Sequence, residues 1–185
     1  MADLFLALIH HPVVNRNGQV VTSAITSLDI HDLARSARTY GVRAFFIVHP
    51  IPEQREFAKS VIDHWRFDFG RAFDARRREA LELVRIVATL DDAGAEAGKI
   101  AGARALVVHT SARTEHGETF ASMRTRLEAP DAPPAMILLG TGFGMTPEMA
   151  ERADILLEAI RGATDYNHLS VRAAGAIILD RLRGR

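Results

Sequence analysis

LLGTGFGMTPE, residues Leu138 to Glu148, and DYNHLSVRAAGAIILDRL, residues Asp165 to Leu182, carry most of the information about the fold of this chain. The first stretch is the end of a buried strand that opens into a glycine-rich turn. The second is a polar turn that opens into an apolar, alanine-rich helix. Glycine tolerates positive φ and lets a ligand approach the backbone closely. Because α/β proteins bind small charged molecules where strand ends feed helix starts, the two turns predict one pocket built from adjacent loops.

The composition limits the classes of function. The 185 residues suffice for one domain with a sizeable core, so we expect a single domain over 1–185. Lys and Arg together number 23, as do Asp and Glu, which argues against a general nucleic-acid coat but leaves room for a local basic patch. The absence of cysteine excludes disulfides, thiolate metal sites and thiol nucleophiles.

The N-terminal apolar run, Leu4 to Ile9, is short and has no basic residues before it, so it does not resemble a signal peptide. No apolar run approaches the roughly 20 residues that a membrane helix needs. We therefore expect a cytoplasmic protein without a membrane partner.

Apolar runs alternate with segments of helical period along the whole chain. Strands are expected at Leu4 to Ile9, Ala44 to Val48, Leu83 to Ala88, Leu106 to His109, Met136 to Leu139 and Ile155 to Leu157. Helices are expected at Leu28 to Tyr40, Glu53 to Phe69, Asp91 to Ile100 (capped by Asp91 or Asp92), Gly117 to Leu127, Pro147 to Arg152 and Leu169 to Leu182. Such alternation predicts an α/β fold, with a mostly parallel sheet and helices on both faces.

Three polar turns follow three of these strands. The glycine turn fits neither G-x-G-x-x-G nor a Walker pattern, so alone it is equally well a tight strand-to-helix connection. In the second turn Asp165, Asn167 and Ser170 could each cap the next helix, yet several different polar groups before an apolar helix favour a binding edge. The third turn, His109 to Arg113 (HTSAR), would alone be a solvated loop. Together the three turns favour a binding site.

Arg35 and Arg38 lie one helical turn apart and share a face. They could form a solvated stripe paired with Asp29 and Asp32, as exposed charges usually do, or they could contact an anion or nucleic acid.

A second basic group, which lies beside Phe69 and Phe73, is the best candidate for RNA contact by composition, because arginine suits phosphate. The start of a surface helix would look the same. With Arg38, the candidates for RNA contact are Arg71, Arg76 and Arg77. The eight histidines show no ligand spacing, so no metal site is predicted.

The late segments, together with the strand DILLEAI that leads into Arg161 and Gly162 and the early helix LARSARTYGV, resemble the SPOUT superfamily of trefoil-knotted RNA methyltransferases that use S-adenosylmethionine. The resemblance covers essentially the whole chain and is closest to a small bacterial branch. It implies a C-terminal trefoil knot and a homodimer whose helices cross near the ligand.

The resemblance also implies that three loops hold S-adenosylmethionine. The residues that it assigns to cofactor binding are Thr110, Ser111, Ala112, Leu139, Gly140, Thr141, Gly142, Gly144, Ile160, Arg161, Gly162, Asn167, His168, Leu169 and Ser170.

Two departures from the family pattern concern catalysis. The ribose-methylating branch usually has asparagine six residues before its arginine, where this chain has Asp29, and glutamate in the glycine turn, where it has Thr141 and Gly142. The resemblance therefore supports the cofactor pocket better than it supports any one atom as the target of methylation. Within the resemblance, Arg35 is the candidate for contact with the acceptor or its phosphate, and Asp165 the candidate base.

Three functions are compatible with the sequence. The first is a methyltransferase acting on tRNA or rRNA. The second is a non-catalytic module for cofactor binding or dimerisation that assists another RNA-modifying protein, as the neutral charge favours. The third is a nucleotide-binding α/β enzyme of another class, which would bind NAD or ATP instead of S-adenosylmethionine.

Overall fold

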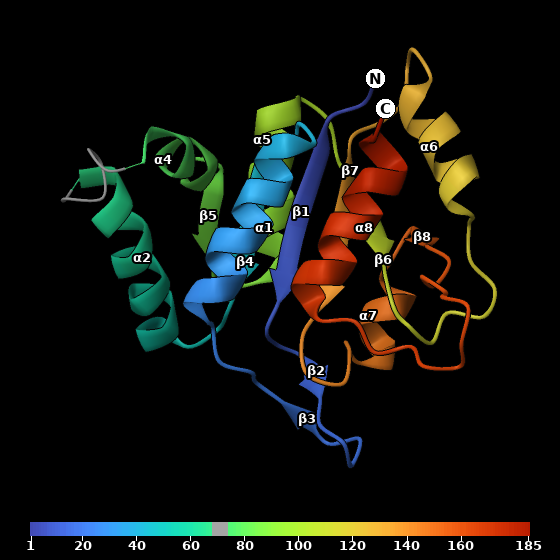
Figure 1. Ribbon diagram of the computed structural model, residues 1–185, viewed down its shortest axis with the longest axis horizontal. Helices are drawn as coiled ribbons and strands as arrows, with labels where there is room; N and C mark the ends of the chain where they lie inside the picture. The colour runs from blue at the N-terminus through green and yellow to red at the C-terminus, as the bar shows by residue number, and fades with distance from the viewer. Residues whose placement is uncertain (68–73) are drawn as a thin grey trace.

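A parallel six-stranded sheet forms the centre of the computed structural model, which describes residues 1–67 and 74–185 (Figure 1). Its order is β5-β4-β1-β7-β6-β8, and all its strand pairs are parallel. The strands are β1 (Leu4–Ile9), β4 (Ala44–Val48), β5 (Val84–Val87), β6 (Leu106–His109), β7 (Ala135–Gly140) and β8 (Ile155–Leu156). The central strands are buried on both faces, which explains their continuous apolar runs.

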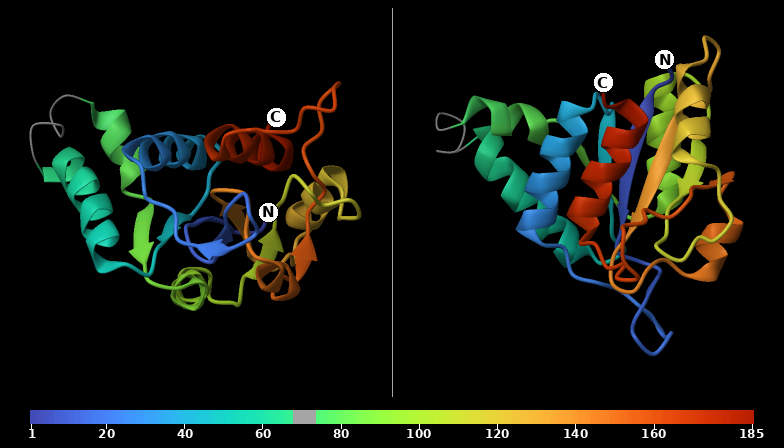
Figure 2. Two further views of the ribbon diagram at one scale, coloured as in Figure 1. Left: turned by 90° about the horizontal axis from the view of Figure 1, so that it is seen from below. Right: turned by 45° about the vertical axis from the view of Figure 1, so that its right-hand side comes forward.

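Helices cover both faces of the sheet, as predicted (Figure 2). One face carries α1 (Ser27–Thr39), α2 (Pro52–Phe67), α4 (Ala75–Leu81), α6 (Phe120–Glu128) and α8 (Val171–Arg183). The other carries α5 (Leu90–Ala101) and α7 (Pro147–Glu151). Alternate residues of β1 point to opposite faces, so Leu6 joins the first core and Phe5 the second.

The small residues of α8 allow it to pack closely against α1 and β7. A Cβ atom on Gly175 would lie 2.6 Å from Cδ2 of Leu33 and 2.9 Å from Cδ1 of Leu139. Position 175 therefore has room for no side chain larger than that of glycine unless Leu33 and Leu139 move.

Five predicted helix starts differ from the structure: those of α1, α2 and α5 by one residue, that of α8 by two and that of α6 by three. Helix α5 is capped by Thr89 rather than by Asp91 or Asp92, in a capping box: the Thr89 hydroxyl accepts from the Asp92 N–H at 3.1 Å, and the Asp92 carboxylate accepts from the Thr89 N–H at 3.1 Å. Helix α6 starts at Phe120 because Thr119 is its cap: the Thr119 hydroxyl accepts from the Ser122 N–H at 3.1 Å. Helix α8 starts at Val171 because Ser170 is its cap.

A hairpin of two short strands, β2 (Val13–Val14) and β3 (Val20–Val21), was not predicted, because strands of two residues carry no readable period. It projects from the end of the sheet where β1 finishes (Figure 1). Its first strand is hydrogen-bonded to the glycine turn: the Val14 N–H donates to the Gly144 carbonyl at 2.9 Å, and the Phe143 N–H donates to the Val14 carbonyl at 3.0 Å.

No helix in the described ranges is long and apolar enough to cross a membrane. The trefoil knot and the single-domain organisation of 1–185 stay predictions. The last two residues of the helix predicted to end at Phe69 lie outside the described residues.

Candidate functional site

Loops at the carboxyl ends of β6, β7 and β8 surround a cavity of about 480 Å³, which the start of α8 closes on one side. This volume is within the range of small-molecule sites. The loops are the three polar turns of the sequence, so the structure brings together the segments that were predicted to form one pocket.

Most of the residues predicted to bind the cofactor are on the cavity wall: Thr110, Ser111, Ala112, Leu139, Gly140, Gly142, Gly144, Ile160, Asn167, His168 and Leu169. Four others are not. The Thr141 hydroxyl points to β1 and donates to the Ile9 carbonyl at 3.0 Å. The Ser170 hydroxyl accepts from the Ala173 N–H at 3.2 Å, and Arg161 and Gly162 are exposed to solvent.

The glycines of the β7 turn meet a conformational need. Gly142 has a φ of +60° and Gly144 a φ of +106°, a region that disfavours other residues. A Cβ atom on Gly142 would also lie 3.1 Å from the Val14 carbonyl oxygen. The hairpin therefore holds the turn from behind while its backbone lines the cavity.

Part of the wall was missed by sequence reasoning. Val171, Ala174 and Ile178 line the cavity at the helical spacing of one face of α8, a spacing that any core-facing helix shares. Glu158 also lines it, and its Oε1 accepts from the Phe120 N–H at 2.6 Å. No local signal in the sequence marks Glu158.

Side-chain hydrogen bonds join the loops. Nδ2 of Asn167 donates to the Ala112 carbonyl at 3.1 Å and so ties the loop before α8 to the loop after β6. Oγ1 of Thr110 donates to the Leu138 carbonyl at 2.6 Å and ties β6 to β7. The cavity is thus held in shape by bonds between segments that are far apart in sequence.

The donor set fits S-adenosylmethionine. Apolar side chains such as Leu139 and Ile178 suit an adenine ring and a thioether carbon chain, whereas the hydroxyls of Thr110 and Ser111 suit a ribose. Arg113, which also lines the cavity, can pair with an anionic group, either a carboxylate or a phosphate. Glycine backbone gives close approach without side-chain obstruction.

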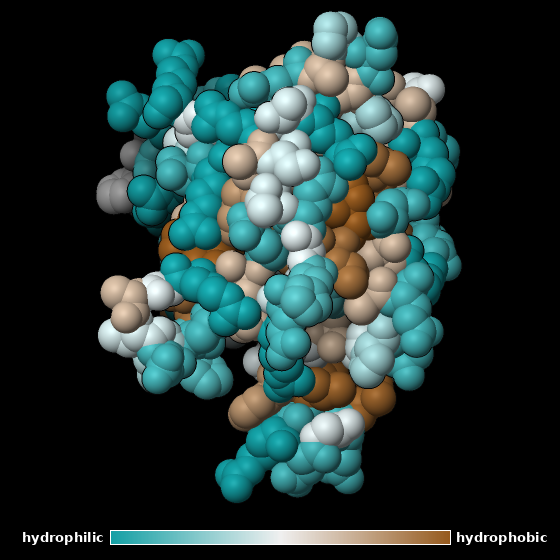
Figure 3. Space-filling model, turned by 90° about the vertical axis from the view of Figure 1, so that its right-hand side faces the viewer, coloured by the Kyte–Doolittle hydropathy of each residue, from teal (hydrophilic) through white to brown (hydrophobic). Residues whose placement is uncertain are grey.

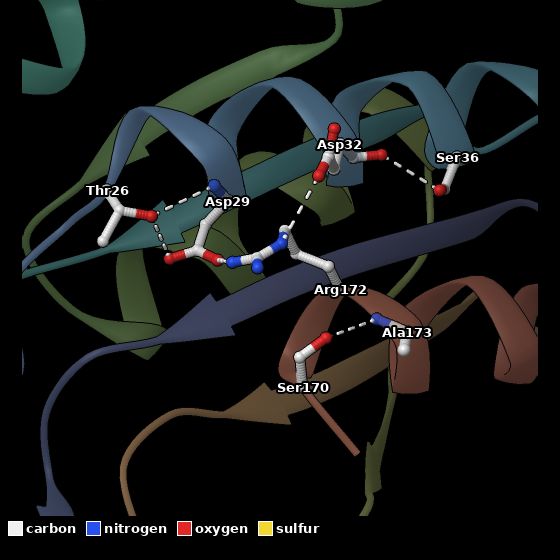
Figure 4. Close-up of polar contacts among 7 residues, drawn as sticks. All are labelled: Thr26, Asp29, Asp32, Ser36, Ser170, Arg172 and Ala173. Atoms are coloured by element: carbon white, nitrogen blue, oxygen red, sulfur yellow. Dashed lines mark hydrogen bonds and ion pairs between the residues drawn. The ribbon is translucent and has the colours of Figure 1, made fainter.

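The two aspartates of α1 pair with α8 rather than with Arg35 and Arg38 (Figure 4). Nη1 of Arg172 lies 2.6 Å from Oδ1 of Asp29, and its Nε lies 3.4 Å from Oδ2 of Asp32. The side chain of Asp29 is only 8% exposed. The solvated stripe in which these aspartates pair with the two arginines is therefore wrong.

The predicted catalytic residues lie apart from the cavity wall. Arg35 is exposed on α1, and no carboxylate within the described ranges pairs with it. Asp165 is exposed in the loop before α8, two residues from Asn167. Neither lines the cavity, so both roles stay predictions.

The basic group around α4 is largely engaged within the chain. Arg38 pairs with Glu79, and Arg77 lies 4.5 Å from the centre of the Trp65 ring. Arg76 is exposed. Arg71, Phe69 and Phe73 lie outside the described residues.

A buried polar cluster that was not predicted lies at the end of β1. Nδ1 of His10 is 2.9 Å from the Ser23 hydroxyl, and Nε2 of His49 is 3.0 Å from the Ser23 carbonyl. Burial lowers the pKa of His10 to about 4 and lowers the pKa of His49 as well, so both rings are neutral at neutral pH. No metal-binding group of His, Asp or Glu occurs in the residues that the structure describes.

Comparisons with known proteins agree with this geometry. A family model described as SAM-dependent RNA methyltransferase matches residues 3–184. An uncharacterized protein of Aquifex aeolicus is 39% identical over 184 residues, which cover 99% of this chain and 89% of that protein. A tRNA (guanine-N(1)-)-methyltransferase of Oleidesulfovibrio alaskensis is 40% identical over 182 residues, which cover 98% of this chain but 42% of that protein.

The fold is also that of a solved methyltransferase. The SpoU methyltransferase AviRb from Streptomyces viridochromogenes, in complex with the cofactor AdoMet, superposes with a TM-score of 0.58 at 17% identity, over 98% of this chain and 56% of that one. The SPOUT resemblance read from the sequence is thereby confirmed at the level of the fold.

Proposed function

The chain belongs to the family of SAM-dependent RNA methyltransferases, and from this premise we propose that it binds S-adenosylmethionine in the cavity of the three loops and methylates a cytoplasmic RNA. The observation that carries the proposal is the cavity itself, whose walls are the turns predicted to hold the cofactor. We propose tRNA as the first substrate to test, because a 40% identical relative bears the name of a tRNA methyltransferase. The chain spans less than half the length of that relative, so the target nucleoside is left to experiment.

The cofactor, when bound, supplies a methyl group that its sulfonium charge has already activated. The protein must mainly align the acceptor with that methyl and, for a hydroxyl or ring N–H acceptor, remove a proton. We propose that Asp165 removes this proton. It lies in the same loop as Asn167, whose side chain is hydrogen-bonded to another wall of the cavity.

The test uses purified protein, labelled S-adenosylmethionine and total RNA from a strain that lacks the gene. Transfer of label, followed by nucleoside analysis, identifies the RNA and the modified base or ribose. Binding of the cofactor without transfer to any RNA would favour the non-catalytic module. A thermal shift with NAD or ATP but not with S-adenosylmethionine would favour an enzyme of another class.

We also propose a homodimer, with α1 and α8 at the interface. Intrachain packing buries Gly175, Ile178 and Leu179 of α8 but leaves Ile177 partly exposed, and Leu28 at the start of α1 is 59% exposed. We expect light scattering at micromolar concentration to give twice the mass of the chain. A monomer under these conditions would count against the proposal.

Arg35→Ala should leave cofactor affinity nearly unchanged and sharply reduce methyl transfer if Arg35 contacts RNA or the acceptor. Arg35→Lys distinguishes charge from shape, because lysine keeps the charge but loses the bidentate guanidinium fork. Methyl transfer under single-turnover conditions is the measurement, with calorimetry of cofactor binding beside it. Full activity of the alanine variant would show that Arg35 has no role in methyl transfer, and would favour Asp165 as the catalytic residue.

A further inference from the structure

Two arginines that pair with no carboxylate of the described residues lie at or next to the cavity wall. Ten of the described arginines pair with a carboxylate, as Arg38 does with Glu79. Arg113, which lines the cavity, and Arg161, which follows the lining residue Ile160, have no such partner within the described ranges. Arg161 is exposed to solvent. Two cations are therefore available to a ligand at this one site.

Exposed aromatic rings gather at the same place. Phe143 lines the cavity and is 52% exposed. Tyr166 is 74% exposed, and its ring centre lies 5.5 Å from that of His168, another lining residue. The side of the molecule that carries α6 and the loops before α8 shows apolar surface between hydrophilic borders (Figure 3).

The arginines and the aromatic rings lie on loops that hydrogen bonds hold in place. The hydrogen bond from the Phe143 N–H to the Val14 carbonyl holds the backbone of Phe143 against the hairpin. Asn167, between Tyr166 and His168, is bonded to the Ala112 carbonyl. The rings thus stand on anchored backbone, which lowers the entropy lost when a flat ligand stacks on them.

We propose that the mouth of the cavity binds an unpaired segment of RNA, with a base stacked on Phe143 and the Tyr166–His168 pair and phosphates on Arg113 and Arg161. Single-stranded RNA is recognised by this combination of aromatic stacking and cationic side chains, because bases in a duplex present no free face. An acceptor base inside a helix must in any case be extruded to meet a reactive group. This inference rests on the proposed function and specifies its substrate as an unpaired, stacked nucleotide.

The experiment measures affinity for a fluorescein-labelled 12-nucleotide RNA of mixed sequence, single-stranded or annealed to its complement, at saturating S-adenosylmethionine. Phe143→Ala should weaken single-strand binding by roughly tenfold, the loss of one stacked base, and Phe143→Tyr should retain it. The double variant Arg113→Gln/Arg161→Gln should flatten the log–log salt dependence by about 1.4, since each lost phosphate contact to a single strand contributes about 0.7. Calorimetry of S-adenosylmethionine binding accompanies each variant.

Phe57→Ala and Lys59→Gln are the matched controls, because both side chains are exposed on α2, outside the cavity. Equal loss in these controls, equal affinity for the duplex, or a Phe143→Ala variant that loses cofactor and RNA affinity in the same proportion would overturn the inference. So would a protein that binds S-adenosylmethionine but no RNA. Failure to bind the cofactor would instead overturn the proposed function, so the two failures are distinguishable.

Discussion

Ala174→Phe should lower the affinity for S-adenosylmethionine by roughly 100-fold, or about 2.7 kcal/mol. Ala174 lies on the first turn of α8 and lines the cavity. A phenyl ring there would occupy space that the ligand needs, and cavity walls braced by loop-to-loop hydrogen bonds have little freedom to retreat. The helix itself should persist, since an interior phenylalanine costs it only about 0.5 kcal/mol relative to alanine.

Calorimetry with S-adenosylmethionine gives the affinity, and thermal denaturation shows that the variant is folded. The matched control is Ala121→Phe, at an exposed position of α6 away from the cavity. Gly142→Val would be a poorer test, because Gly142 has a φ of +60° and its Cβ would meet the Val14 carbonyl. Unchanged affinity in the Ala174 variant would place the cofactor elsewhere.

The sheet and its helices could be predicted because long apolar runs and helical periods are local signals. Leu4–Ile9 and Ala44–Val48 are strands with the predicted bounds, since fully buried parallel strands are apolar throughout. Helix ends were less predictable, because several polar residues compete for a cap; Thr89 is the cap where Asp91 and Asp92 were expected.

The cavity could be predicted in outline because three polar turns follow strands that lie side by side in the sheet. The part of the cavity wall that α8 forms could not be predicted in the same way. Val171 and Ala174 have the spacing of any core-facing helix, so their pattern does not indicate a cavity. The hairpin brace escaped prediction because Val13 and Val14 form too short a strand. Its role depends on hydrogen bonds to Phe143 and Gly144, which are remote in sequence.

The ion-pair partner of Asp29 could not be predicted from the sequence either. Asp29 and Arg35 are six residues apart, so helical spacing does not place them on one face. The actual partner of Asp29 is Arg172, which is 143 residues away along the chain. Only the packing of α8 on α1 puts the two together (Figure 4). Residues that pair across layers leave no periodic trace, so the correct pair required the structure.

Arg172→Met should destabilise the fold by about 3 kcal/mol, the low end of the cost of leaving a buried charge without its partner; here the buried charge is Asp29, while Arg172 is 32% exposed. The side chain of Asp29 is 8% exposed, and without Arg172 its carboxylate keeps the hydrogen bond from the Thr26 hydroxyl at 2.6 Å but loses its opposite charge. Methionine retains most of the apolar stem that packs between the helices. Urea denaturation measures the change in the free energy of unfolding.

The control is Arg124→Met, which breaks an exposed pair with Glu128 on α6 and should cost no more than about 1 kcal/mol. In the double variant Asp29→Leu/Arg172→Met, no buried charge is left without a partner, so much of the lost stability should return. If Arg172→Met costs as little as the control, Asp29 is compensated by other groups and the contact is incidental. A large loss that the double variant repairs would mean that the Arg172–Asp29 pair stabilises the contact of α1, which carries Arg35, with the first turn of α8, which lines the cavity.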